Sequence, residues 1–223
     1  MKTIDKDGYE RLLRHAEVLE RDKFGDKVLR LDSGFFLKLF RVKRVISFKR
    51  LYPEYLRFSL HASRLINLGI PTLTVIEPVK VPHLNRTGVL YDPLEGRTLR
   101  QVAADGGVTS KLAECLGGFI ATLHEKGVYF RSLHLGNIIL GPDEELGLID
   151  VADMRIFPWS LWKNTCVRNF HHLLRYPQDM KTLHEAGIET FVRGYTKKRG
   201  NPWIEKRLIA EIDKHGISGG KFD

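Results

Sequence analysis

Residues 123–150, LHEKGVYFRSLHLGNIILGPDEELGLID, contain two short apolar runs on either side of a turn. The runs are Ile138–Leu140 and Leu146–Ile149, and the segment between them reads GPDEE. Glycine, proline and aspartate favour turns, so the pattern predicts a β-hairpin. Pairing of the two strands would bring Asn137, before the first strand, next to Asp150, after the second.

An amide oxygen beside a carboxylate can hold a hard cation. Mg²⁺ takes oxygen ligands and is usually bound through one or two protein groups together with substrate phosphates. Asn137 and Asp150 are therefore candidate Mg²⁺ ligands. The same pattern also fits a structural role, in which Asn137 caps the loop and Asp150 caps the segment that follows.

This stretch resembles the catalytic segment of protein-kinase-like phosphotransferases, in which an aspartate is followed through four residues by an asparagine. Asn137 falls on the asparagine that holds one Mg²⁺, and Asp150 on the aspartate that opens the metal-binding Asp-Phe-Gly triplet. Residues 133–137, LHLGN, are closest to the branch acting on small molecules and lipopolysaccharide. Within it, the chain resembles the lipopolysaccharide core kinases (the Kdo/WaaP group) and their relatives labelled toluene-tolerance proteins.

The chain departs from the kinase pattern at several positions. Ser132 stands where the catalytic aspartate is expected, Phe130 replaces the preceding histidine, and Val151 and Ala152 follow Asp150. Phosphoryl transfer depends mainly on positioning and electrostatics, whereas general-base assistance contributes about 10²- to 10⁴-fold. Ser132 therefore predicts either a slow enzyme or a different orienting group.

Two nearby residues are candidates for a role in the site, and of these Asp153 is the candidate for that orienting task. Asp153 lies three positions beyond Asp150, and we select it on proximity alone. His134 lies inside the loop, where orienting the loop itself is the favoured role. His124 precedes the loop near a predicted helix end, where a histidine is more often packed and hydrogen-bonded than catalytic.

A lysine in the first half of the chain supplies a possible phosphate contact. Residues 35–40, FFLKLF, predict a strand whose alternation puts Lys38 on one face with Phe36 and Phe40. Burial of an unpaired cation is costly, and Lys38 resembles the third-strand kinase lysine that pairs the α- and β-phosphates. The alternative is a lysine that extends to solvent from an edge strand. Residues 23–28 contain a single glycine, Gly25, so they lack the Gly-x-Gly-x-x-Gly loop of protein kinases.

The resemblance assigns further nucleotide contacts. Residues 53–68 predict a helix with a proline at its first turn and a glycine beyond its end. Glu54 is its only acid and hence the candidate partner of Lys38, although a favourable charge at the helix N-terminus explains it equally well. By resemblance, the linker around Tyr91 and Leu94 would line the adenine pocket.

The remaining periodicity predicts mostly helices in the second half. Strands are expected within residues 24–41 and at 73–76 and 88–91, and helices at 9–20, 109–126, 161–176, 179–197 and 202–215. Cys115 and Cys166 fall in these helices, so two buried thiols are simpler than a disulfide or a zinc site.

Composition limits the location and the partners. The 223 residues carry a net charge of +9, which suits an anionic partner. Basic residues cluster around 41–50 (Arg41, Lys43, Arg44, Lys49, Arg50) and 193–199, although solvated faces would explain both clusters. The sequence shows neither a membrane-spanning run nor a signal-peptide core. We expect a cytoplasmic protein, with peripheral contact at the inner face of the cytoplasmic membrane as an option.

The resemblance implies an α+β, protein-kinase-like two-lobed fold in one domain, residues 1–223. A small antiparallel-sheet N-lobe with one main helix would occupy residues 1–92, a hinge 93–97, and a mainly helical C-lobe 98–223. The implied function is ATP- and Mg²⁺-dependent phosphorylation of a sugar in the lipopolysaccharide core or another anionic glycolipid, with no nucleic-acid partner. The alternative is a catalytically impaired pseudokinase that binds nucleotide and scaffolds or regulates envelope assembly.

Overall fold

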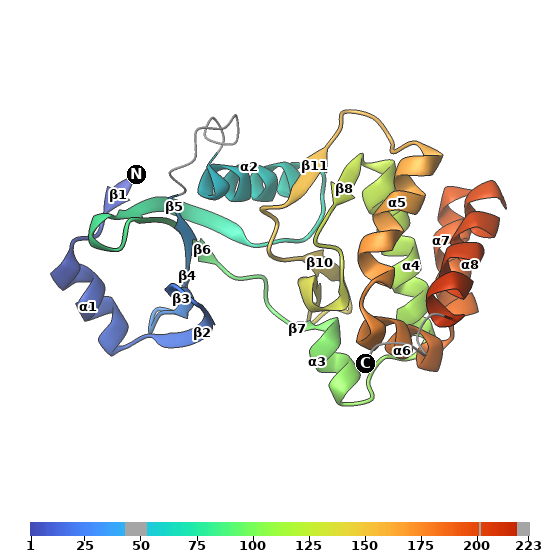
Figure 1. Ribbon diagram of the computed structural model, residues 1–223, viewed down its shortest axis with the longest axis horizontal. Coiled ribbons are helices and arrows are strands. Elements are labelled where there is room, and N and C mark those ends of the chain that lie inside the picture. Colours follow the sequence, from blue (N-terminus) through green and yellow to red (C-terminus); the bar gives the residue numbers. More distant parts are fainter. Residues whose placement is uncertain (43–52, 201, 218–223) are drawn as a thin grey trace. The chain divides into compact units, whose positions relative to one another are not determined.

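The computed structural model describes residues 1–42, 53–200 and 202–217 (Figure 1). The chain divides into two compact units, Met1–Leu94 and Glu95–Asp223. The division falls within the residues expected to form a hinge. The grouping of both units into one kinase-like domain stays a prediction, and each unit is described by itself.

The first unit is built on a six-stranded sheet with the order β1-β5-β6-β4-β3-β2. Neighbouring strands are antiparallel except β1 and β5, which are parallel, so the sheet is mixed rather than purely antiparallel. The strands are β1 (Lys2–Thr3), β2 (Glu17–Asp22), β3 (Gly25–Arg30), β4 (Phe36–Arg41), β5 (Thr74–Val81) and β6 (Arg86–Asp92).

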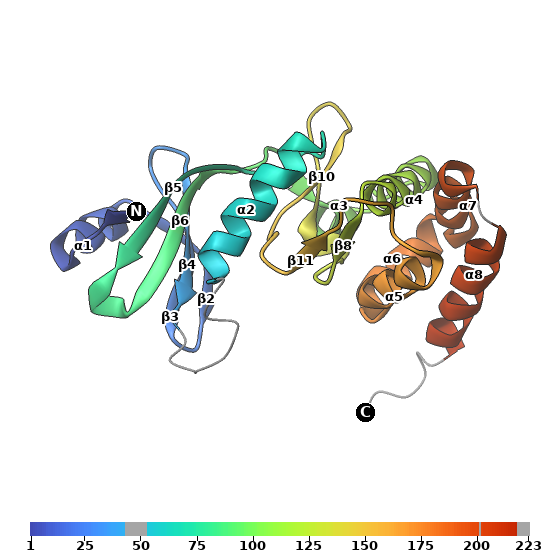
Figure 2. The ribbon, with the colours of Figure 1, turned by 90° about the horizontal axis from the view of Figure 1, so that it is seen from above.

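Helices α1 (Lys6–Arg14) and α2 (Glu54–Asn67) accompany this sheet, and α2 packs on β4, β5 and β6 (Figure 2). The two sheet faces differ, as the alternation in β4 predicts. Phe40 lies on the α2 face, with its ring centroid 5.7 Å from that of Phe58. Leu37 and Leu39 lie on the other face, in a buried cluster with Tyr9 of α1.

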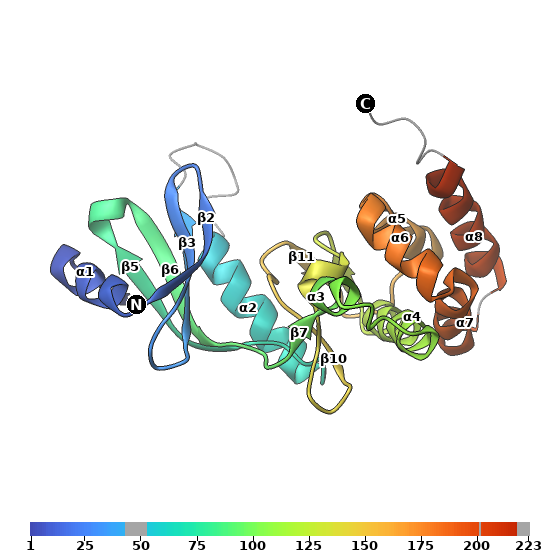
Figure 3. The ribbon, with the colours of Figure 1, turned by 90° about the horizontal axis from the view of Figure 1, so that it is seen from below.

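The second unit is mainly helical. Its helices are α3 (Leu99–Ala104), α4 (Ser110–Glu125), α5 (Lys163–Leu174), α6 (Pro177–Ala186), α7 (Ile188–Arg199) and α8 (Pro202–Ile217). Its strands form the sheets β10-β9-β7 and β11-β8: β7 (Arg97–Thr98), β8 (Val128–Phe130), β9 (Ile138–Leu140), β10 (Leu146–Leu148) and β11 (Met154–Ile156). Helix α4 packs on α7 and α5 packs on α8 (Figure 3).

Glycines permit the close packing of α4 on α7. A Cβ atom on Gly117 would lie 2.1 Å from the Phe191 carbonyl oxygen, and one on Gly194 would lie 2.0 Å from the Glu114 carbonyl oxygen. Both distances are far below van der Waals contact, so any larger residue would force the two helices apart. Among the described helices, α4 and α7 make the most extensive contact.

Several sequence predictions are confirmed. The fold is α+β, with a unit built on a sheet and a mainly helical unit. The hairpin forms from β9 and β10, and the Gly141 amide donates to the Glu145 carbonyl at 2.9 Å across the turn. Helices α2 and α4 lie within one residue of their predicted limits.

The helix predicted over residues 9–20 is wrong in its second half. Helix α1 starts after Asp5, whose side chain accepts a hydrogen bond from the Gly8 amide, and ends at Arg14. Residues 17–22 instead form β2, where Val18 pairs with Leu29. Pairing with β3 and contact with the buried cluster outweigh the local helical spacing.

Two other predictions also need correction. The single helix predicted over residues 179–197 is divided at Gly187, whose φ of +101° is readily adopted only by glycine. Cys166 is buried as predicted, but Cys115 is exposed.

The basic cluster that the sequence shows after Arg41 lies in residues 43–50, which are outside the described residues. None of the helices in the described parts of the chain has the length and apolar character needed to cross a membrane.

Candidate functional site

The β9–β10 hairpin brings the two candidate metal ligands to the same end of one sheet. The last strand pair is Ile138 with Leu148, and the Ile149 amide then donates to the Asn137 carbonyl at 3.0 Å. Asp150 is the next residue along the chain. The structure therefore juxtaposes these two positions, as the sequence predicts, while their role as ligands stays a prediction.

Local contacts orient both residues. The buried Asn137 donates from Nδ2 to the Ser132 carbonyl at 2.9 Å, which commits the amide nitrogen to the loop and leaves Oδ1 as the acceptor end. Asp150 has a φ of +52°, in the left-handed region. A non-glycine residue in such a conformation is strained, and strain of this kind concentrates at functional sites.

A buried carboxylate supports the loop between β8 and β9. Asp179, at the start of α6, is 1% exposed and accepts from the Leu135 amide at 2.9 Å. Arg100 donates to the same carboxylate from Nε at 2.7 Å and from Nη2 at 3.1 Å. The Asp179 carboxylate of α6 thus accepts three hydrogen bonds, one from the loop and two from Arg100 of α3, and these fix the loop conformation.

His134 lies beside this support. Its ring makes an edge contact with Tyr176, at 4.9 Å between centroids, and its buried Nδ1 has no hydrogen-bond partner among the described residues. Burial, followed by the charge of Arg100, lowers the His134 pKa, whereas Asp179 and Asp150 act in the opposite direction. The imidazole is therefore held neutral, which suits a residue that orients the loop.

Ser132 and Asp153 lie just beyond the paired ends of β8 and β11. Met154 of β11 pairs with Phe130 of β8, and the Arg131 amide donates to the Asp153 carbonyl at 3.0 Å. The Asp153 carboxylate also pairs with the Arg131 guanidinium at 3.3 Å, and both side chains are about half exposed. Asp153 is thus close in the fold to the Ser132 backbone, while its catalytic role stays a prediction.

The backbone before Ser132 is held by Asn169 of α5. Asn169 accepts from the Phe130 amide at 3.2 Å and donates to the Phe130 carbonyl at 2.6 Å. His124 bonds Asn169 Oδ1 through Nε2 at 3.2 Å and the Tyr195 hydroxyl through Nδ1 at 2.9 Å. Burial lowers the His124 pKa to about 3, so this histidine is structural, as predicted.

In the first unit, Lys38 is a buried cation on a central strand. Strand β4 lies between β3 and β6, so the edge-strand alternative is excluded. The side chain is 5% exposed, and its Nζ lies 5.6 Å from the centre of the Phe58 ring on α2. Glu54 lies in the first turn of α2, 4.0 Å from Arg57. Its pairing with Lys38 stays a prediction.

The predicted adenine-lining residues end the first unit. Tyr91 is opposite Phe36 in the sheet and packs edge to face on it, with ring centroids 5.7 Å apart. The same ring lies 5.5 Å from Phe58, so its side chain belongs to the aromatic cluster around Lys38. Leu94 is half-buried at the boundary of the unit. Their contact with a nucleotide stays a prediction.

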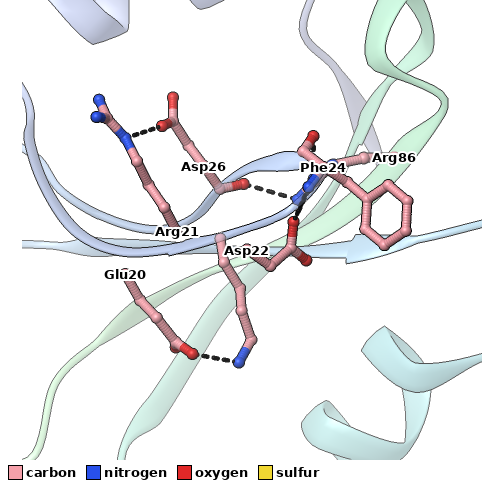
Figure 4. Close-up of polar contacts among 7 residues, drawn as sticks. Glu20, Arg21, Asp22, Phe24, Asp26 and Arg86 are labelled. Carbon is pink, nitrogen blue, oxygen red and sulfur yellow. Dashed lines mark hydrogen bonds and ion pairs between the residues drawn. The ribbon is translucent and has the colours of Figure 1, made fainter.

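A buried arginine fixes the β2–β3 turn. Arg86, 4% exposed, donates to the carbonyls of Asp26 and Phe24 at 2.7 Å each and to the Asp22 carboxylate at 3.3 Å (Figure 4). The Phe24 amide and, secondarily, the Arg86 charge lower the Asp22 pKa. Sequence reasoning missed Arg86, because an arginine that begins a strand gives no local signal of its distant partners.

The donors present match the chemistry of Mg²⁺. Asn137 and Asp150 supply an amide oxygen and a carboxylate, and phosphate oxygens usually complete such a site. Within the described ranges, no group of three or more histidine, cysteine, aspartate or glutamate residues could hold a metal by itself. The binding of a metal by this pair stays a prediction.

Comparison with known proteins leaves the family open. No protein-family model matches the chain, and no curated protein matches it. One solved structure that it resembles is a divergent kinase lacking the glycine-rich loop, which regulates membrane ultrastructure of the Toxoplasma parasitophorous vacuole. The likeness has a TM-score of 0.46 and 16% identity over 85% of this chain and 69% of that one.

Proposed function

We propose that the protein is a kinase-like phosphotransferase that uses ATP and Mg²⁺. The observation that carries the proposal is the juxtaposition of Asn137 with Asp150, one oriented by the Ser132 carbonyl and the other held in a left-handed conformation. The buried Lys38, on a central strand among aromatic rings, supports it independently. The proposal requires the two units to present Lys38 and Asp150 to a single nucleotide.

Each residue has a defined task in this proposal. Lys38 binds the α- and β-phosphates, while Asn137 and Asp150 hold the metal. Mg²⁺, when bound, would neutralise charge on the phosphates. Ser132 lacks a carboxylate, so Asp153 is proposed to orient the acceptor hydroxyl, and His134 to keep the loop in place. Tyr91 and Leu94 would line the adenine pocket, and Glu54 would pair with Lys38.

The acceptor is proposed from resemblance and charge. The net charge of +9 favours an anionic acceptor. The sequence LHLGN at residues 133–137 favours a sugar of the lipopolysaccharide core or another anionic glycolipid. The reaction would then take place at the inner face of the cytoplasmic membrane. A direct comparison of transfer to core sugar, intact lipopolysaccharide and a protein substrate tests this choice.

A second candidate is a pseudokinase that binds nucleotide without transferring phosphate. Ser132 favours it, because a serine hydroxyl at neutral pH is no substitute for a carboxylate base. The ion pair of Asp153 with Arg131 also favours it, since that pair occupies the nearest alternative carboxylate. In this case the nucleotide would stabilise a scaffold for envelope assembly.

Calorimetric titration with ATP tests the nucleotide site. The wild type should bind ATP with Mg²⁺ and much more weakly without it, and Asp150→Ala and Lys38→Met should each weaken binding at least tenfold. Asp143→Ala is the matched control, because Asp143 is an exposed acid in the hairpin turn. Absence of binding in the wild type, or undiminished binding by Asp150→Ala, would exclude the proposed site.

Substitution of Ser132 separates the enzyme from the pseudokinase. Ser132→Asp should raise phosphate transfer by about 10²-fold if the position faces an acceptor. Ser33→Asp, which adds the same charge in an exposed turn, should leave transfer unchanged. If Ser132→Asp binds ATP normally and transfers no phosphate to any acceptor, the pseudokinase becomes the better description.

A further inference from the structure

All three tryptophans of the chain are exposed, which is unusual for the largest aromatic side chain. Trp159, Trp162 and Trp203 are 58%, 76% and 40% exposed. Tryptophan is normally well buried, so its repeated exposure indicates a surface with a function.

The three residues belong to one end of the helical unit. Trp159 and Trp162 lie in the segment that leads into α5, and Trp203 lies in the first turn of α8. The starts of α5 and α8 lie side by side (Figure 1). Lys163 Nζ and the Arg207 guanidinium carbon each lie 5.9 Å from the centre of the Trp203 ring. We call these five residues the tryptophan patch.

The backbone beneath the patch is firmly held. Arg199 of α7 donates to the Ser160 hydroxyl at 2.6 Å and to the Leu161 carbonyl at 2.9 Å. The Leu161 amide donates to the His124 carbonyl at 2.8 Å, and the Leu161 side chain is 3% exposed. The flanking rings are therefore displayed on a fixed platform while Leu161 anchors the segment in the core.

We propose that the tryptophan patch docks on a membrane surface that contains anionic phospholipids. Tryptophan prefers the boundary between water and hydrocarbon, where its ring is apolar and its indole N–H is polar. Lys163 and Arg207 supply the positive charge that anionic head groups attract. The inference is independent of phosphate transfer, because a pseudokinase would use the same surface.

Charge composition favours lipid over a protein partner. Lysine is depleted at protein–protein interfaces, whereas tryptophan and arginine are enriched there. Here a lysine, Lys163, stands over the ring of Trp203. An exposed ammonium group beside exposed indoles matches phosphate head groups better than a protein surface.

Intrinsic fluorescence tests the proposal directly, because the chain has no other tryptophan than the three in the patch. Vesicles of phosphatidylcholine and phosphatidylglycerol (3:1) should shift the emission to shorter wavelength and carry the protein into the pellet on centrifugation. Pure phosphatidylcholine vesicles should do so at least tenfold less well, and added salt should weaken binding to the anionic vesicles.

Variants assign the binding to this surface. Trp162→Ser combined with Trp203→Ser, and Lys163→Glu combined with Arg207→Glu, should each weaken vesicle binding at least tenfold. The matched control is Lys111→Glu with Lys181→Glu, which makes the same charge change away from the patch. Lys111 lies at the start of α4, whereas the end of α4 contacts Leu161, and Lys181 lies on α6. Circular dichroism should show that every variant keeps the wild-type fold.

Three outcomes would overturn the proposal. One is the absence of binding to the anionic vesicles, and another is an equal loss of binding in the control. The third is an emission shift that depends on protein concentration in the absence of vesicles. That result would assign the patch to contact with a second copy of the chain.

Discussion

The β2–β3 turn of the first unit and the loop before β9 in the second are both held by one buried charged group, but of opposite sign. Arg86 donates to main-chain carbonyls of the turn, whereas Asp179 accepts from the Leu135 amide and from Arg100. Both groups come from other elements. The conformation of each loop therefore depends on a distant residue, and that of the β2–β3 turn also on Gly25, whose φ of +114° favours glycine.

Removal of Arg86 and removal of Asp179 would leave different groups without their hydrogen-bond partners. Without Arg86, carbonyls lose their donor, but the Asp22 carboxylate is one-third exposed and can turn to water. Without Asp179, a guanidinium and an amide lose a buried carboxylate. Arg100, 30% exposed, can also turn partly to water, but the Leu135 amide then loses a charged acceptor, and hydrogen bonds to charged groups contribute more than those between neutral groups. The loop before β9 should therefore lose more stability on removal of Asp179 than the β2–β3 turn loses on removal of Arg86.

Asp179→Ala should have the largest effect. Loss of the carboxylate that accepts from the Leu135 amide and from the partly exposed Arg100 should reduce the free energy of unfolding by about 3–4 kcal/mol. Urea denaturation followed by tryptophan fluorescence measures it, because all the tryptophans are in the second unit. Asp105→Ala, which removes the exposed partner of Arg97, should change it by less than about 1 kcal/mol. Equal effects would show that Asp179 does not support the loop.

Arg86→Ala should come next. Buried carbonyls left without a donor cost roughly 1–3 kcal/mol each, and water can replace part of that loss near the exposed turn. We expect the free energy of unfolding to fall by about 2–3 kcal/mol in total. Arg86→Lys should be intermediate, because an ammonium cannot span all three acceptors. Hydrogen exchange of residues 22–26 reports the turn itself. Arg21→Ala removes an exposed pair with Asp26 and serves as the control.

The same comparison shows what the sequence can and cannot predict. The GPDEE turn, the helices α2 and α4 and the shared face of Phe36, Lys38 and Phe40 follow from local patterns, and the fold has all of them. Arg86 and Asp179 could not be identified, because their partners lie 60 and 44 residues away. Their positions, at a strand start and in a first helical turn, are ordinary ones for charged residues.

The candidate site divides in the same way. Juxtaposition of Asn137 and Asp150 follows from hairpin geometry and was predictable. The strain at Asp150 and the contact from Asn137 to Ser132 depend on the path of the chain in three dimensions. The break at Gly187 was overlooked because the apolar spacing continues across it, although the glycine itself was a usable signal.

A smaller effect should come from His134, through pH. Its pKa is lowered, first by burial and then by Arg100, so the folded state disfavours the protonated ring. Stability from this group is full above the ordinary pKa of 6.5 and is lost as the pH falls below it. Because the ring is half-buried and partly screened, we expect less than about 1 kcal/mol between pH 7.5 and 5.5.

Urea denaturation of the wild type and of His134→Asn at both pH values measures this term. The difference between the two proteins should shrink as the pH falls, while the contribution of His124 is common to both and cancels. A difference that does not change with pH would mean that the loop tolerates a charged imidazole. The β2–β3 turn, residues 22–26, contains no histidine, so its hydrogen exchange should show no such dependence on pH.

The smallest effect on stability should come from Asp153→Asn. The pair with Arg131 is about half exposed, and such pairs contribute at most about 1 kcal/mol. If Asp153 orients an acceptor hydroxyl, however, its loss should lower phosphate transfer by about 10²-fold or more. A variant that unfolds like the wild type but transfers poorly would thus separate the chemistry of this carboxylate from the structural support given by Asp179. Unchanged transfer in Asp153→Asn, with ATP binding intact, would remove Asp153 from the mechanism and leave the loop held in place without a base.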